Sequence, residues 1–111
     1  VEVEATAKIL GDAVARPNRN LNFLLQIKNP AEEAKMSLVY EIETPGKNPS
    51  RPRRRKCGAG TIFIPAKATT DFTLRERLFD THAAPLIAGV CKAKFFLNGN
   101  LIAEVEFELK R

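Results

Sequence analysis

Apolar and polar residues alternate along most of this chain, which is the pattern of strands with one buried face and one solvated face. In residues 1–9, VEVEATAKI, the odd positions are apolar and the even positions polar. The same period of two recurs in 21–28, 36–43 and 69–75, and a short apolar run covers 61–64. Each of these segments is predicted to be a strand, because a helix needs apolar positions three or four residues apart.

The end of the chain carries the strongest local signal, a β-hairpin. Two alternating runs, 88–97 and 101–110, flank the tripeptide Asn98-Gly99-Asn100. Asn-Gly between alternating runs is typical of a tight hairpin connection. One face of each run is apolar, and the opposite face carries lysines in the first run and glutamates in the second.

The charges on this hairpin predict its register. A three-residue loop over 98–100, with Gly99 or Asn100 in the left-handed conformation, pairs apolar with apolar and positive with negative residues. The pairs expected are Leu97 with Leu101, Phe95 with Ala103, Lys94 with Glu104, and Lys92 with Glu106. A two-residue turn would bring the two glutamates onto the buried face, so we predict the three-residue loop.

About seven short strands with no sustained helical periodicity predict an all-β fold, an antiparallel β-sandwich in preference to a barrel. One helical turn is allowed at 77–80, where the alternation stops. The length of 111 residues suits a single domain, 1–111, with one hydrophobic core.

The order of strands, a long middle crossover and the run GVCKAKFFLNG before a final strand resemble an immunoglobulin-like or fibronectin type III-like sandwich. True immunoglobulin domains add a core Trp between two cysteines and a Tyr two residues before the second cysteine. This chain has no Trp, and Gly89 stands where that Tyr would be. In Gly89-Val90-Cys91, Cys91 also replaces the Tyr of the Gly-x-Tyr often found in fibronectin-like modules. The resemblance implies an architecture of many uses and no site residues.

No apolar run approaches the roughly 20 residues that span a bilayer, and the first ten residues do not resemble a secretory signal. The missing initiator Met is expected of a processed protein or of a domain excised from a longer one. Cys57 and Cys91 permit one disulfide in an oxidising compartment or two free thiols elsewhere. Free thiols are favoured, because Cys57 follows a basic segment expected to be mobile.

The segment 44–60, TPGKNPSRPRRRKCGAG, stands out by charge and is predicted to be a long irregular loop. Its cations are Lys47, Arg51, Arg53, Arg54, Arg55 and Lys56, and it contains no acid. These are six of the eighteen Lys and Arg residues, so the remaining twelve nearly balance the thirteen acids of a chain whose net charge is +5. The positive excess therefore belongs to this segment.

The forked guanidinium group of arginine forms paired hydrogen bonds with phosphate, sulfate or carboxylate. The six cations are therefore candidate residues for binding a polyanion or an acidic partner. The segment contains no aromatic residue that would stack on bases, which disfavours specific recognition of single strands. Two alternatives stay open. The segment can be a solvated loop that protects a sheet edge, or a linear targeting or cleavage signal.

Catalytic and metal-binding patterns do not emerge from the sequence. His82 is the only histidine, and with Asp80 two residues before it and no nearby Ser a catalytic triad is not expected. Glu32-Glu33 and the glutamates of the last strand read as solvated. We expect no enzyme, no cofactor and no metal site.

A second candidate surface lies at the hairpin tip. Val39, Val90, Phe96 and Ile102 fall on outward faces in the expected register, so they can pack under a loop or mark an interface. The residues proposed for that interface are Phe96, Asn98, Gly99, Asn100 and Ile102.

The sequence thus predicts a non-catalytic binding module that contacts a protein or neighbouring domain in a larger protein or assembly. The alternatives are a binder of nucleic acid or glycosaminoglycan through the Arg-rich loop, and a small protein inhibitor of a hydrolase.

Overall fold

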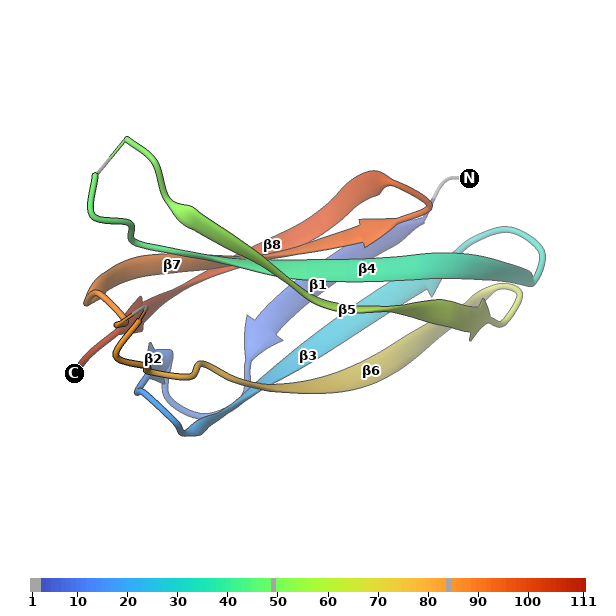
Figure 1. The fold of residues 1–111 in the computed structure, drawn as a ribbon. Helices are drawn as coiled ribbons and strands as arrows, with labels where there is room; N and C mark the ends of the chain where they lie inside the picture. Colours follow the sequence, from blue (N-terminus) through green and yellow to red (C-terminus); the bar gives the residue numbers. More distant parts are fainter. Residues whose placement is uncertain (1–2, 49, 84) are drawn as a thin grey trace.

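The computed structural model describes residues 3–48, 50–83 and 85–111, which form two β-sheets (Figure 1). The first sheet has the order β1-β3-β6, with β1 Glu4–Ile9, β3 Asn20–Asn29 and β6 Ala68–Arg77. The second has the order β2-β8-β7-β4-β5, with β2 Val14–Ala15, β8 Asn100–Leu109, β7 Gly89–Leu97, β4 Ala34–Thr44 and β5 Arg53–Ile64. No helix occurs among the described residues, so none crosses a membrane there, and the helical turn allowed at 77–80 is wrong.

One strand pair departs from the expected antiparallel arrangement. The two residues of β2 run parallel to β8, with Val14 opposite Glu108. Backbone hydrogen bonds hold this short strand, since Lys110 N donates to Ala15 O over 2.9 Å. The fold is therefore all-β and mostly antiparallel, with one parallel edge.

Side chains of both sheets meet in one core. The Phe23 ring of β3 lies edge-on to the rings of Phe95 in β7 and Phe107 in β8, with centroids 5.9 and 6.0 Å apart. Alternate residues of β3, β4, β7 and β8 are buried, as the period of two predicts: Leu21, Phe23, Leu25, Ile27, Met36, Leu38, Ile42, Cys91, Ala93, Phe95, Leu97, Phe107 and Leu109. Burying each of the larger side chains contributes about 1.5–3 kcal/mol, so this pattern dominates the stability of the fold.

The hairpin has the predicted charge pairs but not the predicted loop. Lys94 faces Glu104 and Lys92 faces Glu106, as expected. Asn98 and Gly99 form a two-residue turn, with φ of 49° and 83°, so Leu97 faces Asn100 instead of Leu101. The prediction of a three-residue loop is therefore wrong.

A β-bulge in β8 reconciles the short turn with the charge pairs. Phe96 faces Leu101 and Phe95 faces Ala103, so Ile102 is an extra residue without an opposite partner. Ile102 is half-buried and packs against the core, while Leu101 is 51% exposed. The outward position assigned to Ile102 from the sequence belongs to Leu101.

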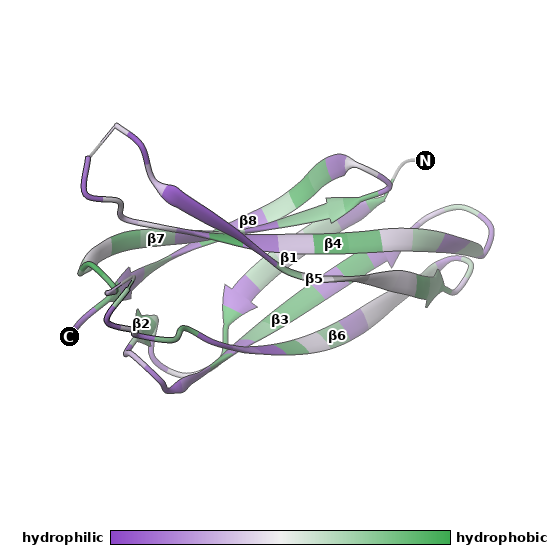
Figure 2. Ribbon diagram, in the orientation of Figure 1, coloured by the Kyte–Doolittle hydropathy of each residue, from purple (hydrophilic) through white to green (hydrophobic). Residues whose placement is uncertain are grey.

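The segment predicted as an irregular loop, 44–60, is mostly strand. Thr44 ends β4, and the connection covers 45–52. The rest of the segment, 53–60, belongs to β5. Gly58 permits this pairing because a Cβ there would collide with the ring of Tyr40, which stacks on Phe95 at 5.8 Å. Figure 2 shows β5 hydrophilic at its start and more hydrophobic toward its far end.

Candidate functional site

Every second connection of the chain lies at the same end of the molecule, because successive long strands run antiparallel. The segments at one end, which we name the basic end, are 10–19, 45–52, 78–88 and 110–111 (Figure 1). They carry six cations, Arg16, Arg19, Lys47, Arg51, Lys110 and Arg111, against the two acids Asp12 and Asp80. The connections at the opposite end, 30–33, 65–67 and 98–99, carry Lys67 against Glu32 and Glu33. Positive charge therefore collects at one end.

Two of the exposed cations of the basic end lie in the 45–52 connection. Lys47 and Arg51 are exposed, and neither lies within ion-pair distance of an acid in the described part of the chain. Backbone contacts shape the connection: Arg51 N donates to Asn48 O over 2.9 Å. A Cβ on Gly46 would collide with the carbonyl oxygen of Arg51, so glycine is required there. Two exposed cations thus lie in a connection that requires glycine at Gly46.

The four consecutive cations of β5 do not act together, because alternate residues of a strand point to opposite faces. Arg54 and Lys56 lie on the outer face of the second sheet, opposite Glu43 and Glu41 of β4. Their side chains are exposed, and Arg54 Nε lies 3.7 Å from Glu43 Oε1. This outer pair is partly neutralised.

The other two arginines of β5 contact neighbouring segments of the chain. Arg55 lies 3.7 Å from the carboxylate of Glu76, donates to Arg77 O and places its guanidinium 5.9 Å from the Phe79 ring. Arg53 donates to Pro85 O over 2.9 Å. These two side chains fasten β5 to the end of β6 and to the 78–88 connection, so a ligand would have to displace protein contacts to use them.

Two rows of alternating charge cross the outer face of the second sheet from β5 to β8. The rows, read from the registers, are Lys56, Glu41, Lys94, Glu104 and Arg54, Glu43, Lys92, Glu106. The tightest contact joins Lys94 Nζ to Glu43 Oε2 at 2.5 Å. Hydrogen bonding from Lys94 holds the pKa of Glu43 below its usual value, although burial opposes this. The two rows contain four positive and four negative side chains, so this face attracts neither anions nor cations in preference.

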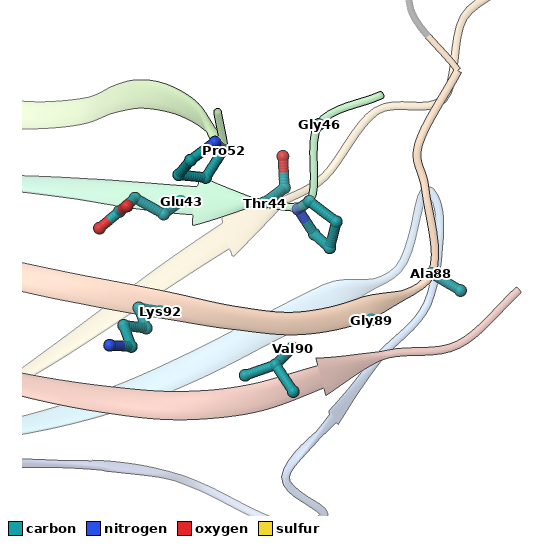
Figure 3. A pocket seen from close by; sticks show the side chains of 9 residues that line it. Glu43, Thr44, Gly46, Pro52, Ala88, Gly89, Val90 and Lys92 are labelled. Carbon is teal, nitrogen blue, oxygen red and sulfur yellow. The ribbon is translucent and has the colours of Figure 1, made fainter. Parts of the chain in front are cut away.

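A shallow groove of about 410 Å³ opens at the basic end between the end of β4 and the start of β7 (Figure 3). Pro45, Pro52 and Val90 give it apolar walls, and Glu43 and Lys92 contribute opposite charges. Gly89 has a φ of 148°, and a Cβ there would lie 2.9 Å from Pro45 Cγ, so its backbone is tightly packed. Because its two charges oppose each other, the groove adds little to anion binding.

A clamp that the sequence did not reveal fixes the 78–88 connection. The Asp80 carboxylate accepts from Arg111 Nη2 at 2.6 Å and from Leu86 N at 2.8 Å. Arg111 Nη1 also donates to Leu86 O. The hydrogen bond from Leu86 and then that from Arg111 hold the pKa of Asp80 below its usual value. Arg111 is therefore committed to structure.

The hairpin surface is divided between structural and exposed residues. Asn98 N donates to Ser37 O over 2.8 Å, and Asn98 Oδ1 accepts from Ser37 N over 2.9 Å, so Asn98 ties the turn to β4. Gly99 and Asn100 are exposed at the tip. Phe96 is half-buried and lies between Val39 and Leu101 in adjacent strands, which forms an outer apolar row.

Cys57 of β5 and Cys91 of β7 lie in different strands. Cys57 and Cys91 are both free. Burial raises the pKa of each thiol to about 11, with a further contribution from Glu76 at Cys57, so both stay protonated at neutral pH. His82 is exposed in the 78–88 connection. Within the described ranges, no three His, Cys, Asp or Glu side chains are grouped as a metal site.

No protein-family model matches this chain, and no curated protein is similar to it in sequence. Solved structures are similar in fold. The alkylpurine DNA glycosylase AlkC of Pseudomonas fluorescens, bound to DNA containing an abasic site analogue, matches with a TM-score of 0.75 and 18% identity over 99% of this chain and 31% of that chain. A β-glucosidase of Listeria innocua matches with a TM-score of 0.73 and 14% identity over 99% of this chain and 16% of that chain.

A third similar structure is a separate domain. The CARDB domain of a Pyrococcus furiosus protein, in complex with di-metal ions, matches with a TM-score of 0.66 and 12% identity over 97% of this chain and 92% of that chain. At these identities the likenesses show the fold alone. The chain spans less than a third of the glycosylase and about a sixth of the glucosidase.

Proposed function

We propose that this chain is a non-catalytic interaction module of a longer protein, and that its basic end contacts the phosphate backbone of nucleic acid. The observation that carries the proposal is the separation of charge between the two ends, with Lys47 and Arg51 exposed and unneutralised at one of them. Such an end attracts a polyanion over distance and gains affinity by releasing its counterions.

The contacts expected are to phosphate and not to base edges. Lys47 and Arg51 lie in the connection between β4 and β5, and Arg54 follows at the start of β5 with its side chain 65% exposed. The exposed aromatic ring of Phe79 is covered on one face by Arg55, which disfavours stacking of a base on that face. The glycosylase with a similar fold is bound to DNA, which supports nucleic acid over a sulfated polymer.

Fluorescence polarisation with a labelled DNA duplex of about 20 base pairs, from about 50 to 200 mM salt, tests the proposal. The test variant is Lys47→Ser with Arg51→Ser. The matched control is Lys28→Ser with Lys35→Ser, two exposed lysines in the strands on either side of the 30–33 connection. Each double variant lowers the net charge from +5 to +3.

The test variant should bind about tenfold more weakly at low salt, with a slope of log K against log salt that is smaller by about 1–2. The control variant should bind like the native domain. Equal losses in both variants would contradict a localised site. Binding of heparin without binding of duplex would identify a sulfated polymer as the ligand.

A second candidate, contact with a protein or a neighbouring domain, is favoured by the outer apolar row. Leu101 is 51% exposed beside Phe96, and Val39 continues the row on β4. A Leu101→Ser variant that lost a partner without any salt dependence would support this function. Retention of duplex binding by the same variant would separate the two surfaces.

The finer description of the fold is also part of this proposal. We infer an immunoglobulin-like sandwich, since the orders β1-β3-β6 and β8-β7-β4-β5 correspond to strands A-B-E and G-F-C-C′ of that architecture. The likeness to a CARDB domain supports it.

A further inference from the structure

The strand β5 lies at the edge of the second sheet and pairs only with β4. The next strand in the chain, β6, joins β3 in the first sheet and makes no ladder with β5. One side of a twelve-residue strand therefore presents backbone N–H and C=O groups to which another strand can pair. Natural edge strands of this length are usually protected by charges, proline or a bulge.

Only the first half of β5 carries such protection. Four consecutive cations occupy Arg53–Lys56, and a bulge makes Cys57 an extra residue opposite β4. The second half, 58–64, contains no charge and no proline. Gly60 and Thr61 are exposed there, and Phe63 is 50% exposed. This half is an uncharged edge, and its last four residues, 61–64, are strong strand formers.

The other edge strands are protected or short. In β1 the charges of Glu4 and Lys8 leave three uncharged residues between them. In β6 Asp71 and Arg75 leave no uncharged run longer than three residues, and β2 has only two residues. The uncharged stretch of β5 is therefore longer than that of any other edge strand described, which makes this edge the best candidate for pairing with another strand.

We propose that a second copy of this chain pairs with this edge, antiparallel and centred on Thr61, so that residues 58–64 of the two copies form one ladder. In this register Ile62 of each copy lies opposite Gly60 of the second copy. A large side chain thus meets a residue without one, and neither copy crowds the other. The two second sheets become a continuous sheet across a two-fold axis.

Charge excludes pairings centred near the start of β5. Centring on Thr61 places the nearest cations of β5, the Lys56 residues of the two copies, about 33 Å apart, five residues on either side of the axis. At physiological ionic strength screening acts over about 8 Å, so their repulsion vanishes. A shift of the centre by about four residues toward the start of β5 brings the two Lys56 residues within about 7 Å of each other, which disfavours that register. The uncharged half is thus self-complementary, whereas the basic half excludes slipped pairings.

Sedimentation equilibrium over a wide range of protein concentration tests this inference. The native domain should be in reversible equilibrium between monomer and dimer, with little dependence on salt. Thr61→Lys places a charge at the axis and should weaken dimerisation at least about tenfold, because like charges lie directly opposite. The matched control is Thr73→Lys, the same substitution at an exposed position of the edge strand β6, and it should dimerise like the native domain.

Three outcomes would overturn the inference: a native domain that stays monomeric at millimolar concentration, a Thr61→Lys variant that dimerises normally, or a Thr73→Lys variant that dissociates. Circular dichroism melting establishes that each variant is folded. Should Thr61→Lys not fold, Thr61→Glu supplies the same test, because it too brings two like charges directly opposite each other at the axis.

Discussion

Lys94 Nζ lies 2.5 Å from Glu43 Oε2, and this contact is the centre of the charge rows on the outer face. Both side chains are mostly covered, with 22% and 12% of their surface exposed. Replacing Glu43 by Gln leaves Lys94 without its closest partner. We expect Glu43→Gln to lower the free energy of unfolding by about 1–2 kcal/mol.

The control for that substitution is Glu104→Gln at an exposed position of β8. Urea unfolding should show a change below about 0.5 kcal/mol for this variant. Equal effects of the two substitutions would mean that the Lys94–Glu43 contact has no special weight.

The same carboxylate predicts how stability depends on acid. The pKa of Glu43 is lower in the folded chain than its ordinary value of 4.5. As the pH falls, Glu43 therefore binds a proton in the unfolded chain before it does so in the folded chain. The stabilisation that is present above pH 4.5 is lost as the pH falls through the pKa of the folded chain. Unfolding free energies of the native domain and of Glu43→Gln should converge below pH 4.5, and a constant difference down to the lowest pH would contradict this assignment.

Gly58 and Gly60 provide a matched pair within β5. A Cβ at Gly58 meets the ring of Tyr40, whereas a Cβ at Gly60 meets no atom within 4 Å. We expect Gly58→Ala to cost about 1–3 kcal/mol through overpacking, and Gly60→Ala to change stability by less than about 1 kcal/mol. Denaturant midpoints measured at low protein concentration give both values. Equal costs would show that Tyr40 can move aside.

The clamp formed by Arg111 predicts a local effect. Arg111→Ala removes the hydrogen bonds to Asp80 and Leu86 and leaves the core untouched. Amide exchange in 78–88 should speed up while global stability changes little, since such connections open separately from the core. Lys110→Ala, at the exposed neighbouring position, should leave exchange unchanged, and acceleration in both variants would point to fraying of the C-terminus instead.

The sequence predicts those parts of the fold in which burial follows a period of two. Leu25 and Ile27 in β3 and Cys91 and Ala93 in β7 alternate with polar residues, and each is buried. The start of β5 was missed because four consecutive cations give no such alternation. Pairing with β4 decides the structure there, since Glu41 and Glu43 face Lys56 and Arg54.

The candidate site was predicted only in part, because charge along a sequence does not say which side chains are free. Arg53 and Arg55 are among the six cations predicted to bind a polyanion. In the structure Arg53 contacts Pro85 and Arg55 contacts Glu76. Arg16 and Arg19, by contrast, lie at the basic end without having been assigned to it. Counting alternate connections of an antiparallel chain would have placed them there.

The two bulges of the second sheet share one line across it. The extra residue Cys57 interrupts the ladder on one side of Tyr40, and the extra residue Ile102 interrupts it beyond Phe95, which faces Tyr40. Bulges bend strands, so curvature concentrates along this line. The charge rows lie on one side of the bend and the apolar row on the other. The outer face thus consists of two facets of different chemistry set at an angle, and a rigid planar partner can engage only one of them at a time.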